Sequence, residues 1–342
     1  MSGTDITNLL DIVQRKINAV DSSASTSDLL YLLSAIRQSG EGSVFAYDNE
    51  SQIPNLLDGT PDPEMIAYTL DSDKLYFQRG SWVGKEIPII PFQGSNYGYT
   101  SGGLTSNVIE KFTFSTDANA TDVGDLTSGR YGVAGQSSQT HGYASGGWDG
   151  SNSNVIDKFT FSADANATDL GDLTESKAEP SGQSSQTHGY ASGGQVGDPS
   201  VTWVRTIDKF SFTTNGNASD VGDLGSTTWA AAGQSSSTHG YSSGGFVNNI
   251  PYPAATSNAI SKFPFASDGS VTDVGDLTEY RYQGSGQSST TYGYVSGGFR
   301  NAPFPNALIN IIDKFPFASD GNAADVGDLT VTMYNGAAGQ QH

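Results

Sequence analysis

Three histidines occupy one slot of a repeated sequence and are the first candidates for chemistry. His141, His188 and His239 each precede Gly-Tyr, and tyrosine fills this slot at Tyr97 and Tyr292. Imidazoles can hold zinc when several converge on one ion. Equivalent residues of successive repeats stand too far apart for a single ion, because each repeat is a separate structural unit. We therefore expect these side chains to pack between repeats, and we expect no metal or cofactor.

Acid-rich turns recur in the same repeats and faintly resemble calcium loops. They begin at Asp117, Asp164, Asn215, Asp268 and Asp320. Carboxylate and amide oxygens are the ligands that calcium prefers. Asn-Gly and Asp-Gly between two strands are, however, strong signals of a hairpin. Tight turns are the favoured interpretation, and calcium binding stays open as an alternative.

A lysine and an aspartate are also present in every copy. The lysines are Lys111, Lys158, Lys209, Lys262 and Lys314, and the aspartates of the Gly-Asp-Leu step are Asp125, Asp172, Asp223, Asp276 and Asp328. An active site needs its groups once, so residues that occur in all copies are most simply architectural. We predict Lys-to-Asp pairing between strands, within or between repeats.

These residues belong to a unit that occurs five times between residue 98 and the C-terminus. Each copy reads Gly-Tyr-x-Ser-Gly-Gly, a loop, Ile-x-Lys-Phe-x-Phe (with small variations), a turn and Asp-(Val/Leu)-Gly-Asp-Leu. The double glycines are 44, 47, 51 and 53 residues apart, and such spacings are typical of propeller blades. In the second copy we expect strands at 135–138, 141–145, 155–161 and 168–173.

The two ends of the array indicate how it closes. The first copy has a poor inner strand at 93–96, and the last copy runs into 336–340, which has the inner-strand sequence. A C-terminal strand that completes the first blade would remove exposed sheet edges. The expected fold is mainly β, a propeller of about five four-stranded blades over residues 93–342, unless residues 41–92 supply a sixth.

The repeat resembles the kelch family. A double glycine ends the second strand, an aromatic residue lies on the third, and a basic residue precedes the next inner strand at Arg130, Lys177 and Arg281. The resemblance implies a kelch-like β-propeller and little about activity. The fourth strand departs from the family, because Asp-Val-Gly-Asp-Leu stands where kelch blades usually carry a tryptophan.

The N-terminal region has a different pattern. Apolar residues spaced by four and three indicate a helical seam, followed by a second amphipathic helix near 28–37. The seam and the second stripe comprise Ile6, Leu10, Val13, Ile17, Val20, Leu29, Leu33 and Ile36. Since two heptads are marginal alone, residues 1–40 are predicted to oligomerise or anchor the protein. The alternative is a helical hairpin that packs on its own domain. Residues 41–92 are predicted to form a small β module with a hairpin across 65–78.

A second resemblance covers this region. The helical start, the module ending Leu75-Tyr76-Phe77 and Gly80-Ser81-Trp82-Val83, and the glycine-rich repeats look like virion structural proteins of tailed phages, especially marine cyanophages. The resemblance implies a tail appendage or capsid decoration protein, located in the virion. Its N-terminal region would contact other virion proteins, and the protein would be a homo-oligomer.

Candidate recognition residues lie where the copies differ. The loop after the double glycine lengthens from 7 to 10, 14, 16 and 15 residues. Aromatic and arginine side chains on such loops suggest a recognition surface, namely Trp148, Trp203, Arg205, Phe246, Tyr252, Phe299, Arg300 and Phe304. A second set lies between blades, at Tyr131, Trp229, Tyr282 and Tyr334, beside Arg130 and Arg281. Aromatic faces of this kind often bind sugars. Packing of blade edges is the alternative for both sets.

Composition excludes several classes of function. The net charge of −20 disfavours nucleic acid and anionic membranes. The absence of cysteine removes disulfides, thiolate chemistry and the cysteine-modified tyrosine of kelch-type sugar oxidases. No signal peptide or membrane-spanning stretch is visible. We expect a non-catalytic protein: a virion structural component that displays a propeller, with a glycan-binding module or a bacterial kelch-type scaffold as alternatives.

Overall fold

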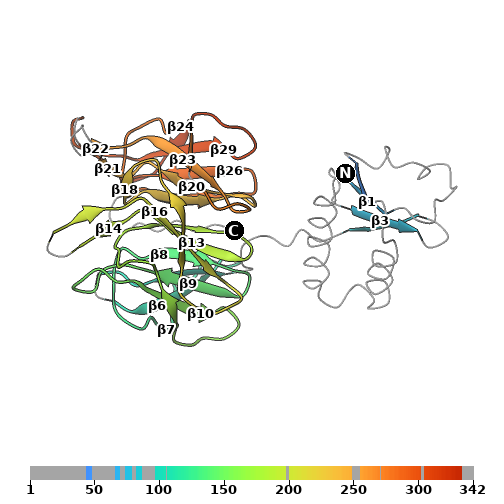
Figure 1. The fold of residues 1–342 in the computed structure, drawn as a ribbon, viewed down its shortest axis with the longest axis horizontal. Helices are drawn as coiled ribbons and strands as arrows, with labels where there is room; N and C mark the ends of the chain where they lie inside the picture. Colours follow the sequence, from blue (N-terminus) through green and yellow to red (C-terminus); the bar gives the residue numbers. More distant parts are fainter. Residues whose placement is uncertain are drawn as a thin grey trace. The chain divides into compact units, whose positions relative to one another are not determined.

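A computed structural model describes residues 97–332, apart from 105, 198–199, 249–254, 270 and 302–303, together with four strands nearer the N-terminus. The chain divides into two compact units, Met1–Pro91 and Phe92–His342 (Figure 1). The described part of the chain is mainly β. The expected helical residues, Ile6 to Ile36, lie outside the described residues.

The described residues of the first unit form one four-stranded sheet. Its strands are β1 (Val44–Tyr47), β2 (Ile66–Thr69), β3 (Lys74–Gln78) and β4 (Trp82–Glu86). Strands β2 and β3 form the predicted hairpin, with Thr69 opposite Lys74. Strands β1 and β2 run parallel, whereas the described sheets of the second unit are antiparallel. This sheet therefore lacks the topology of the repeats.

The second unit contains one sheet for each copy of the repeat. The first three sheets comprise β5 (Tyr97–Ser101), β6 (Val108–Thr113) and β7 (Thr121–Asp125); β8 (Ala134–Ser137), β9 (His141–Ser145), β10 (Val155–Thr160) and β11 (Thr168–Asp172); and β12 (Ser181–Ser184), β13 (His188–Ser192), β16 (Thr206–Ser211) and β17 (Ser219–Asp223). The strand positions predicted for the second copy are confirmed to within about two residues.

The last two sheets repeat this order. They comprise β19 (Ala232–Ser235), β20 (His239–Ser243), β23 (Ala259–Pro264) and β24 (Thr272–Asp276); and β25 (Ser285–Ser288), β26 (Tyr292–Ser296), β29 (Ile311–Pro316) and β30 (Ala324–Asp328). Figure 1 shows the sheets following one another through the unit in sequence order. The copies therefore fold as successive, similar modules.

Glycine is required on the second strand where it stands opposite a phenylalanine of the third strand. A Cβ atom at Gly142 would collide with the ring of Phe159, and the equivalent glycines of the other copies face the equivalent phenylalanine. The double glycine ends the second strand with two positive φ angles, 67° at Gly146 and 103° at Gly147. Glycine alone adopts these angles at little cost, so the Gly-Tyr-x-Ser-Gly-Gly pattern is dictated by backbone geometry.

The inner strands of the four complete sheets lie side by side. A Cβ atom at Gly182 would collide with the carbonyl oxygen of Gly135, and Gly233 and Gly286 stand in the same relation to the preceding glycine. The amide of Ser137 donates to Oγ of Ser184 over 3.0 Å. Small residues therefore let these four strands approach one another closely.

Tyrosine and phenylalanine form the core between sheets. The Tyr143 ring lies 5.5 Å from that of Phe210 and 4.7 Å from that of Phe212, on the next sheet. The same arrangement joins Tyr99 to Phe159 and Phe161, Tyr190 to Phe263 and Phe265, and Tyr241 to Phe315 and Phe317. Each of the first four sheets thus packs a tyrosine against the face of the sheet that follows it.

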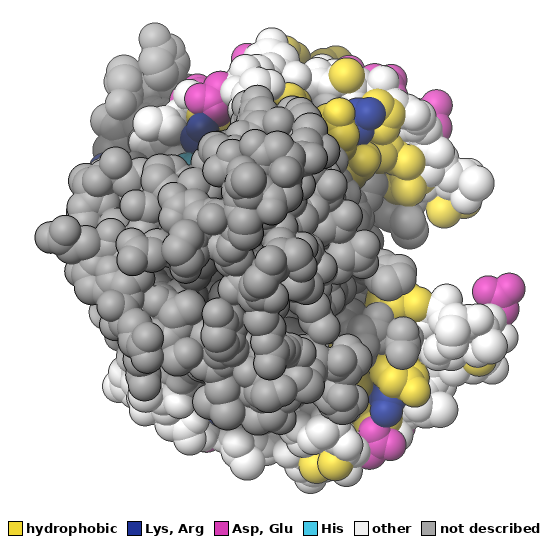
Figure 2. Space-filling model, turned by 90° about the vertical axis from the view of Figure 1, so that its right-hand side faces the viewer, with side chains coloured by type: hydrophobic (Ala, Val, Ile, Leu, Met, Phe, Trp, Pro, Cys, Tyr) yellow, Lys and Arg dark blue, Asp and Glu magenta, His cyan; other side chains and the backbone are white. Residues whose placement is uncertain are grey.

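The outward faces of the first and fifth sheets differ from this pattern. Ile312 is half-buried, whereas its equivalent Ile260 is fully buried, and Phe112 is half-buried, whereas its equivalent Phe210 is fully buried. Hydrophobic side chains lie on both sides of a notch in the described surface (Figure 2). In the described residues the first sheet has three strands and no closed ring is present. The predicted closing strand, 336–340, lies outside the described residues.

Candidate functional site

The long loops form a second tier of short strands. These are β14 (Gln195–Val196) with β15 (Thr202–Trp203), β18 (Thr227–Trp229) with β21 (Phe246–Asn248) and β22 (Ala255–Thr256), and β27 (Phe299–Arg300) with β28 (Ala307–Leu308). In each complete copy the first loop residue pairs with the residue that leads into the inner strand. The pairs are Tyr131 with Trp148, Ala178 with Gln195, Trp229 with Phe246, and Tyr282 with Phe299.

This pairing brings together the two aromatic sets that the sequence presented separately. We define the aromatic arc as Trp203, Trp229, Phe246, Tyr282 and Phe299. Its neighbouring rings lie between 5.4 and 6.2 Å apart, within the range of favourable aromatic contacts. All five side chains are half-buried. The arc therefore spans the loops of the third, fourth and fifth sheets.

Two further aromatic pairs flank the arc. Tyr131 and Trp148 lie 5.4 Å apart on the second sheet. Tyr280 and Phe304, which lie 4.4 Å apart, are each 37% exposed. Neighbouring loops are also joined directly, since Nδ2 of Asn152 donates to the carbonyl of Gly197 over 3.4 Å. The loops of the second and third copies are therefore in direct contact with each other.

One polar atom of the arc is buried without a hydrogen-bond partner. Nε1 of Trp229 is inaccessible and unpaired in the described structure. A buried unpaired N–H group costs free energy. An apolar ring at position 229 would pack against the same neighbours without this cost, so packing alone does not explain the tryptophan.

Beside these aromatic residues lies a ladder of residues with left-handed backbone geometry. We define the left-handed ladder as Gly132, Glu179, Ala230 and Gln283. Their φ angles are 63°, 52°, 54° and 54°. The amide of Glu179 donates to the carbonyl of Gly132, that of Ala230 to Glu179, and that of Gln283 to Ala230, over 2.8 to 3.0 Å. The ladder therefore links four sheets through their backbones.

The side chain of Glu179 crosses this ladder. A Cβ atom at Gly132 would lie 2.8 Å from Cγ of Glu179, so glycine makes room for the glutamate. Nε2 of Gln283 donates to Oε2 of Glu179 over 3.3 Å. Burial raises the pKa of Glu179 above its ordinary value, and the hydrogen bond from Gln283 opposes that rise only in part. Within the described region, no arginine or lysine forms an ion pair with Glu179.

Sequence reasoning missed Glu179 and Gln283. Neither residue type indicates left-handed geometry. The sequence did contain one signal of left-handed geometry: the residue equivalent to Glu179 in the second copy is a glycine, Gly132. A glycine in one copy can mark a backbone position that strains any other residue.

The structure corrects the expectation for two arginines. Arg130 and Arg281 are 0% and 1% exposed and pair with Asp157 and Asp313 at 2.9 and 2.8 Å. Further contacts run to backbone carbonyls, including that of Ala144. A guanidinium with five donors suits such a buried site, where charge and carbonyls must both be satisfied. These arginines hold sheets together and are not presented to a ligand.

The remaining candidates lie at the edge of the loop surface or outside the described residues. Arg205 is exposed and lies 3.3 Å from Asp223. Arg300 pairs with Glu279 at 2.6 Å. Tyr252 and Tyr334 lie outside the described residues.

The repeated lysines pair between sheets, with acids of the turns. Lys111 lies 3.1 Å from Asp164 and Lys209 lies 2.9 Å from Asp268. Lys262 pairs in the same way with Asp320, and Lys158 donates to the amide oxygen of Asn215 over 3.5 Å. Pairing between repeats is confirmed. The prediction that the partners are the aspartates of the Gly-Asp-Leu step was wrong. The lysines instead contact acids in the turn of the following sheet.

The repeated histidines are half-buried. Nδ1 of His141, His188 and His239 lies 2.8 Å from the hydroxyl of the preceding threonine. Burial, and then the nearby lysine, lower the pKa of each imidazole. Across residues 97–332, as described, no cluster of three or more His, Asp or Glu side chains is placed to hold a metal ion.

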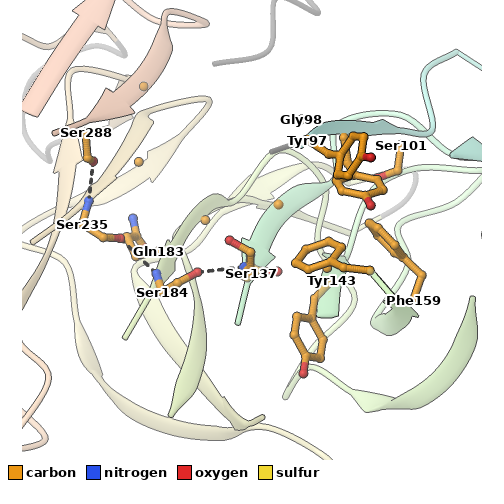
Figure 3. Close-up of a pocket in the computed structure, with 18 of the residues that line it drawn as sticks. Tyr97, Gly98, Ser101, Ser137, Tyr143, Phe159, Gln183, Ser184, Ser235 and Ser288 are labelled. Carbon is orange, nitrogen blue, oxygen red and sulfur yellow. Dashed lines mark hydrogen bonds between the residues drawn. The ribbon is translucent and has the colours of Figure 1, made fainter. Parts of the chain in front are cut away.

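A cavity of about 240 Å³ runs along the inner strands. Its lining includes Tyr97 and Ser101 of β5 on one side and the serines of the four inner strands on the other. Figure 3 shows Ser137, Ser184, Ser235 and Ser288 joined in sequence by hydrogen bonds. The cavity therefore lies beside the edge of β5, where the first sheet has no described inner strand.

Comparison with known proteins adds no functional assignment. No protein-family model matches the chain, and no curated protein matches it. In the described residues no helix has the length and apolar character needed to span a membrane.

Proposed function

We propose that residues 93–342 form a closed, kelch-like propeller of five blades. In this proposal residues 336–340 pair with the free edge of β5 and occupy the cavity beside it. The cavity lining supports this placement, since glycines and serines of the inner strands face it. Gly135 adds support, because no described atom lies within 4 Å of a Cβ built there, whereas the equivalent glycines touch the preceding strand.

Unmatched partners on the first and fifth sheets also favour closure. Lys314 stacks on the ring of Tyr292 at 4.7 Å, and among the described residues it has no partner in the turn of a following sheet, whereas the other four lysines do. Asp117 is the turn acid that would complete the series, and it has no described basic partner. Likewise, Asn166 accepts a hydrogen bond from the amide of Asp125, and closure would give Asn119 the same role toward Asp328.

We propose that this propeller is a non-catalytic part of a tailed-phage virion that contacts the host surface. The aromatic arc is the main observation behind this proposal. Its residues differ between copies and lie on loops, whereas the sheets that hold these loops have nearly the same sequence in every copy. Such loops on a rigid scaffold are where recognition residues are usually found. The N-terminal region would attach the protein to other virion proteins and support a homo-oligomer.

A glycan on the host surface is the favoured contact. Half-buried aromatic rings offer flat apolar faces beside polar groups, an arrangement suited to a small-molecule or sugar site. The net charge of −20 argues against an anionic polymer as the partner. A bacterial scaffold protein is the competing function, and it predicts binding to a cytosolic protein instead.

The test combines location and binding. Gold-labelled antibody against the full chain is applied to virions of the phage that encodes it, and the purified chain is applied to cells of the host. Labelled virions and saturable cell binding are expected. The variant Tyr131→Ala, Trp229→Ala, Tyr282→Ala should lose cell binding, while Tyr280→Ala, Phe304→Ala, which changes an exposed aromatic pair outside the arc, should retain it. Unlabelled virions would contradict the virion assignment.

Folding of both variants is checked by circular dichroism and melting temperature, because Trp229 and Tyr282 contact each other. A folded triple variant that binds cells as well as the native chain would remove the aromatic arc as the contact site. Labelled virions without cell binding would leave a structural role and overturn the host-contact role.

A further inference from the structure

Strain in the described structure is concentrated in the left-handed ladder. Four non-glycine residues have a positive φ angle, and three of these are Glu179, Ala230 and Gln283. Left-handed geometry costs an L-residue about 1 kcal/mol or more. Gly132 shows that the fold accepts glycine in this slot. The glutamate and glutamine are therefore held at a cost that the architecture does not require, and strain of this kind often marks a functional site.

The charge of Glu179 lacks a cation. Its carboxylate accepts one hydrogen bond from the neutral amide of Gln283, and no described lysine or arginine pairs with it. Two other glutamates of the connecting segments do have cationic partners, since Glu175 lies 3.8 Å from Lys177 and Glu279 lies 2.6 Å from Arg300. Burying an unpaired carboxylate is unfavourable. A positively charged ligand group would supply the missing partner.

Aromatic residues directly precede three of the four ladder residues in the sequence. Trp229 directly precedes Ala230, and Tyr282 directly precedes Gln283, with their rings 5.6 Å apart. Tyr131 precedes Gly132 in the same way. Aromatic faces are electron-rich and attract cations, and cages of such rings bind alkylammonium groups. The net charge of −20 adds a favourable long-range field.

We propose that the left-handed ladder and its flanking rings, Tyr131, Trp229 and Tyr282, bind an alkylammonium group of a ligand, with Glu179 as the counter-charge. This inference rests on the proposed recognition role of the same surface and names the chemistry of what it recognises. A metal ion fits less well, because Ca²⁺ and Mg²⁺ require about six oxygen ligands and the ladder offers one carboxylate. A neutral ligand would leave the carboxylate without a cation.

The experiment titrates the full chain with choline, followed by calorimetry and tryptophan fluorescence. The comparison ligands are the neutral carbon isostere of choline, in which a tert-butyl group replaces the trimethylammonium group, and methyl glucoside. Choline is expected to bind at least about tenfold more tightly than either, because only choline gains the charge and cation–π terms. Equal binding of the isostere, preference for the glucoside, or no choline binding would each overturn the proposal.

The matched variants are Glu179→Gln and Glu279→Gln. The first removes the unpaired charge with little change in shape and should weaken choline binding by about tenfold or more. The second makes the same change at a glutamate already paired with Arg300 and should leave binding unchanged. Should Glu179→Gln fail to fold, Gly132→Ala provides the second test, because its methyl group must displace the Glu179 side chain and weaken binding.

Host-cell binding is measured separately with the native chain. Cell binding without choline binding would reject the alkylammonium site and retain the recognition role. Choline binding without cell binding would retain the site and reject the host-surface role. Choline binding that survives Glu179→Gln would show that the carboxylate is not the counter-charge, and this too overturns the proposal.

Discussion

Arg130 and Asp157 form an ion pair that is closed to solvent on both sides. Nη2 of Arg130 lies 2.9 Å from Oδ2 of Asp157, and both side chains are 0% exposed. Lys177 with Asp208 and Arg281 with Asp313 repeat this pair at two further junctions between sheets. At the remaining described junction Thr228 and Ser261 stand in the same two positions. The same structural position is therefore occupied by an ion pair in three copies and by two neutral residues in the fourth copy.

Removing one member of the charged pair should be far more damaging than removing both. Arg130→Thr leaves Asp157 buried without its cation, and we expect a loss of about 3–5 kcal/mol in the free energy of unfolding. Arg130→Thr with Asp157→Ser reproduces the neutral junction and should recover a large part of that loss. Urea denaturation of the two single variants and the double variant measures the coupling. Additive losses in the cycle would show that the pair is not coupled.

The glycines of the inner strands test closure of the ring. Gly182→Ala places a methyl group against the carbonyl of Gly135, and we expect a loss of about 1–3 kcal/mol. Gly135 has no described atom in that position. If residues 336–340 fill it, Gly135→Ala should be equally costly in the full chain and nearly harmless in a chain that ends at Asn335. Thermal denaturation of both lengths makes the comparison, and a harmless Gly135→Ala in the full chain contradicts closure.

The strands could be predicted because each copy repeats the same local constraints. The double glycine, the Phe-x-Phe step and the acid turns fix where strands begin and end, so β9 runs from His141 to Ser145 as expected. Lysine pairing between copies was predictable from its recurrence. Its partner was not, because the turn of a neighbouring sheet is distant in sequence: Asp164 is 53 residues from Lys111.

The candidate site was predicted less well, and its errors have physical causes. Arg130 was expected beside the aromatic residues of a ligand site, whereas it is fully buried and paired with Asp157, as buried arginines usually are paired. A comparison of copies within the chain held the missing clue: the copy with Thr228 in place of the basic residue also has Ser261 in place of the acid. The aromatic arc joins residues from two sets because backbone bridges pair Tyr282 with Phe299, which no local pattern reveals.

The repeated histidines should make stability fall in mild acid. Their pKa values are lowered in the folded state from the ordinary value of 6.5, so the unfolded chain binds protons first as pH decreases. The free energy of unfolding should thus be constant above about pH 7 and decrease as pH falls through 6.5 toward the folded pKa values. Replacing all three histidines by tyrosine, the residue found at Tyr97 and Tyr292, should flatten this decrease. An unchanged slope between pH 7 and 5 would exclude the histidines as its source.

Asn215 gives a direct measure of what the lysine pairs contribute. Lys158 meets an amide there, whereas Lys209 meets the carboxylate of Asp268, which is 57% exposed. Exposed pairs contribute about 0–1 kcal/mol, so Asn215→Asp should stabilise the protein by less than about 1 kcal/mol, and less at high salt. Asp268→Asn is the reverse change and should destabilise it by a similar amount. Effects of the same sign in both variants would mean that charge pairing is not what is being measured.

Glu179 should trade stability for binding. Its φ angle of 52° is strained for glutamate and accessible to glycine, and its half-buried side chain has no cationic partner among the described residues. Glu179→Gly relieves both costs while removing the hydrogen bond to Gln283, and we expect a net gain of about 1 kcal/mol at pH 7, together with loss of choline binding. Glu279→Gly, at a glutamate paired with Arg300, should instead lower stability by about 1 kcal/mol. Melting temperatures and choline titrations of the two variants decide the matter. A destabilised Glu179→Gly variant would show that the ladder stores no strain at this residue, and the reason for placing a glutamate there would have to be structural.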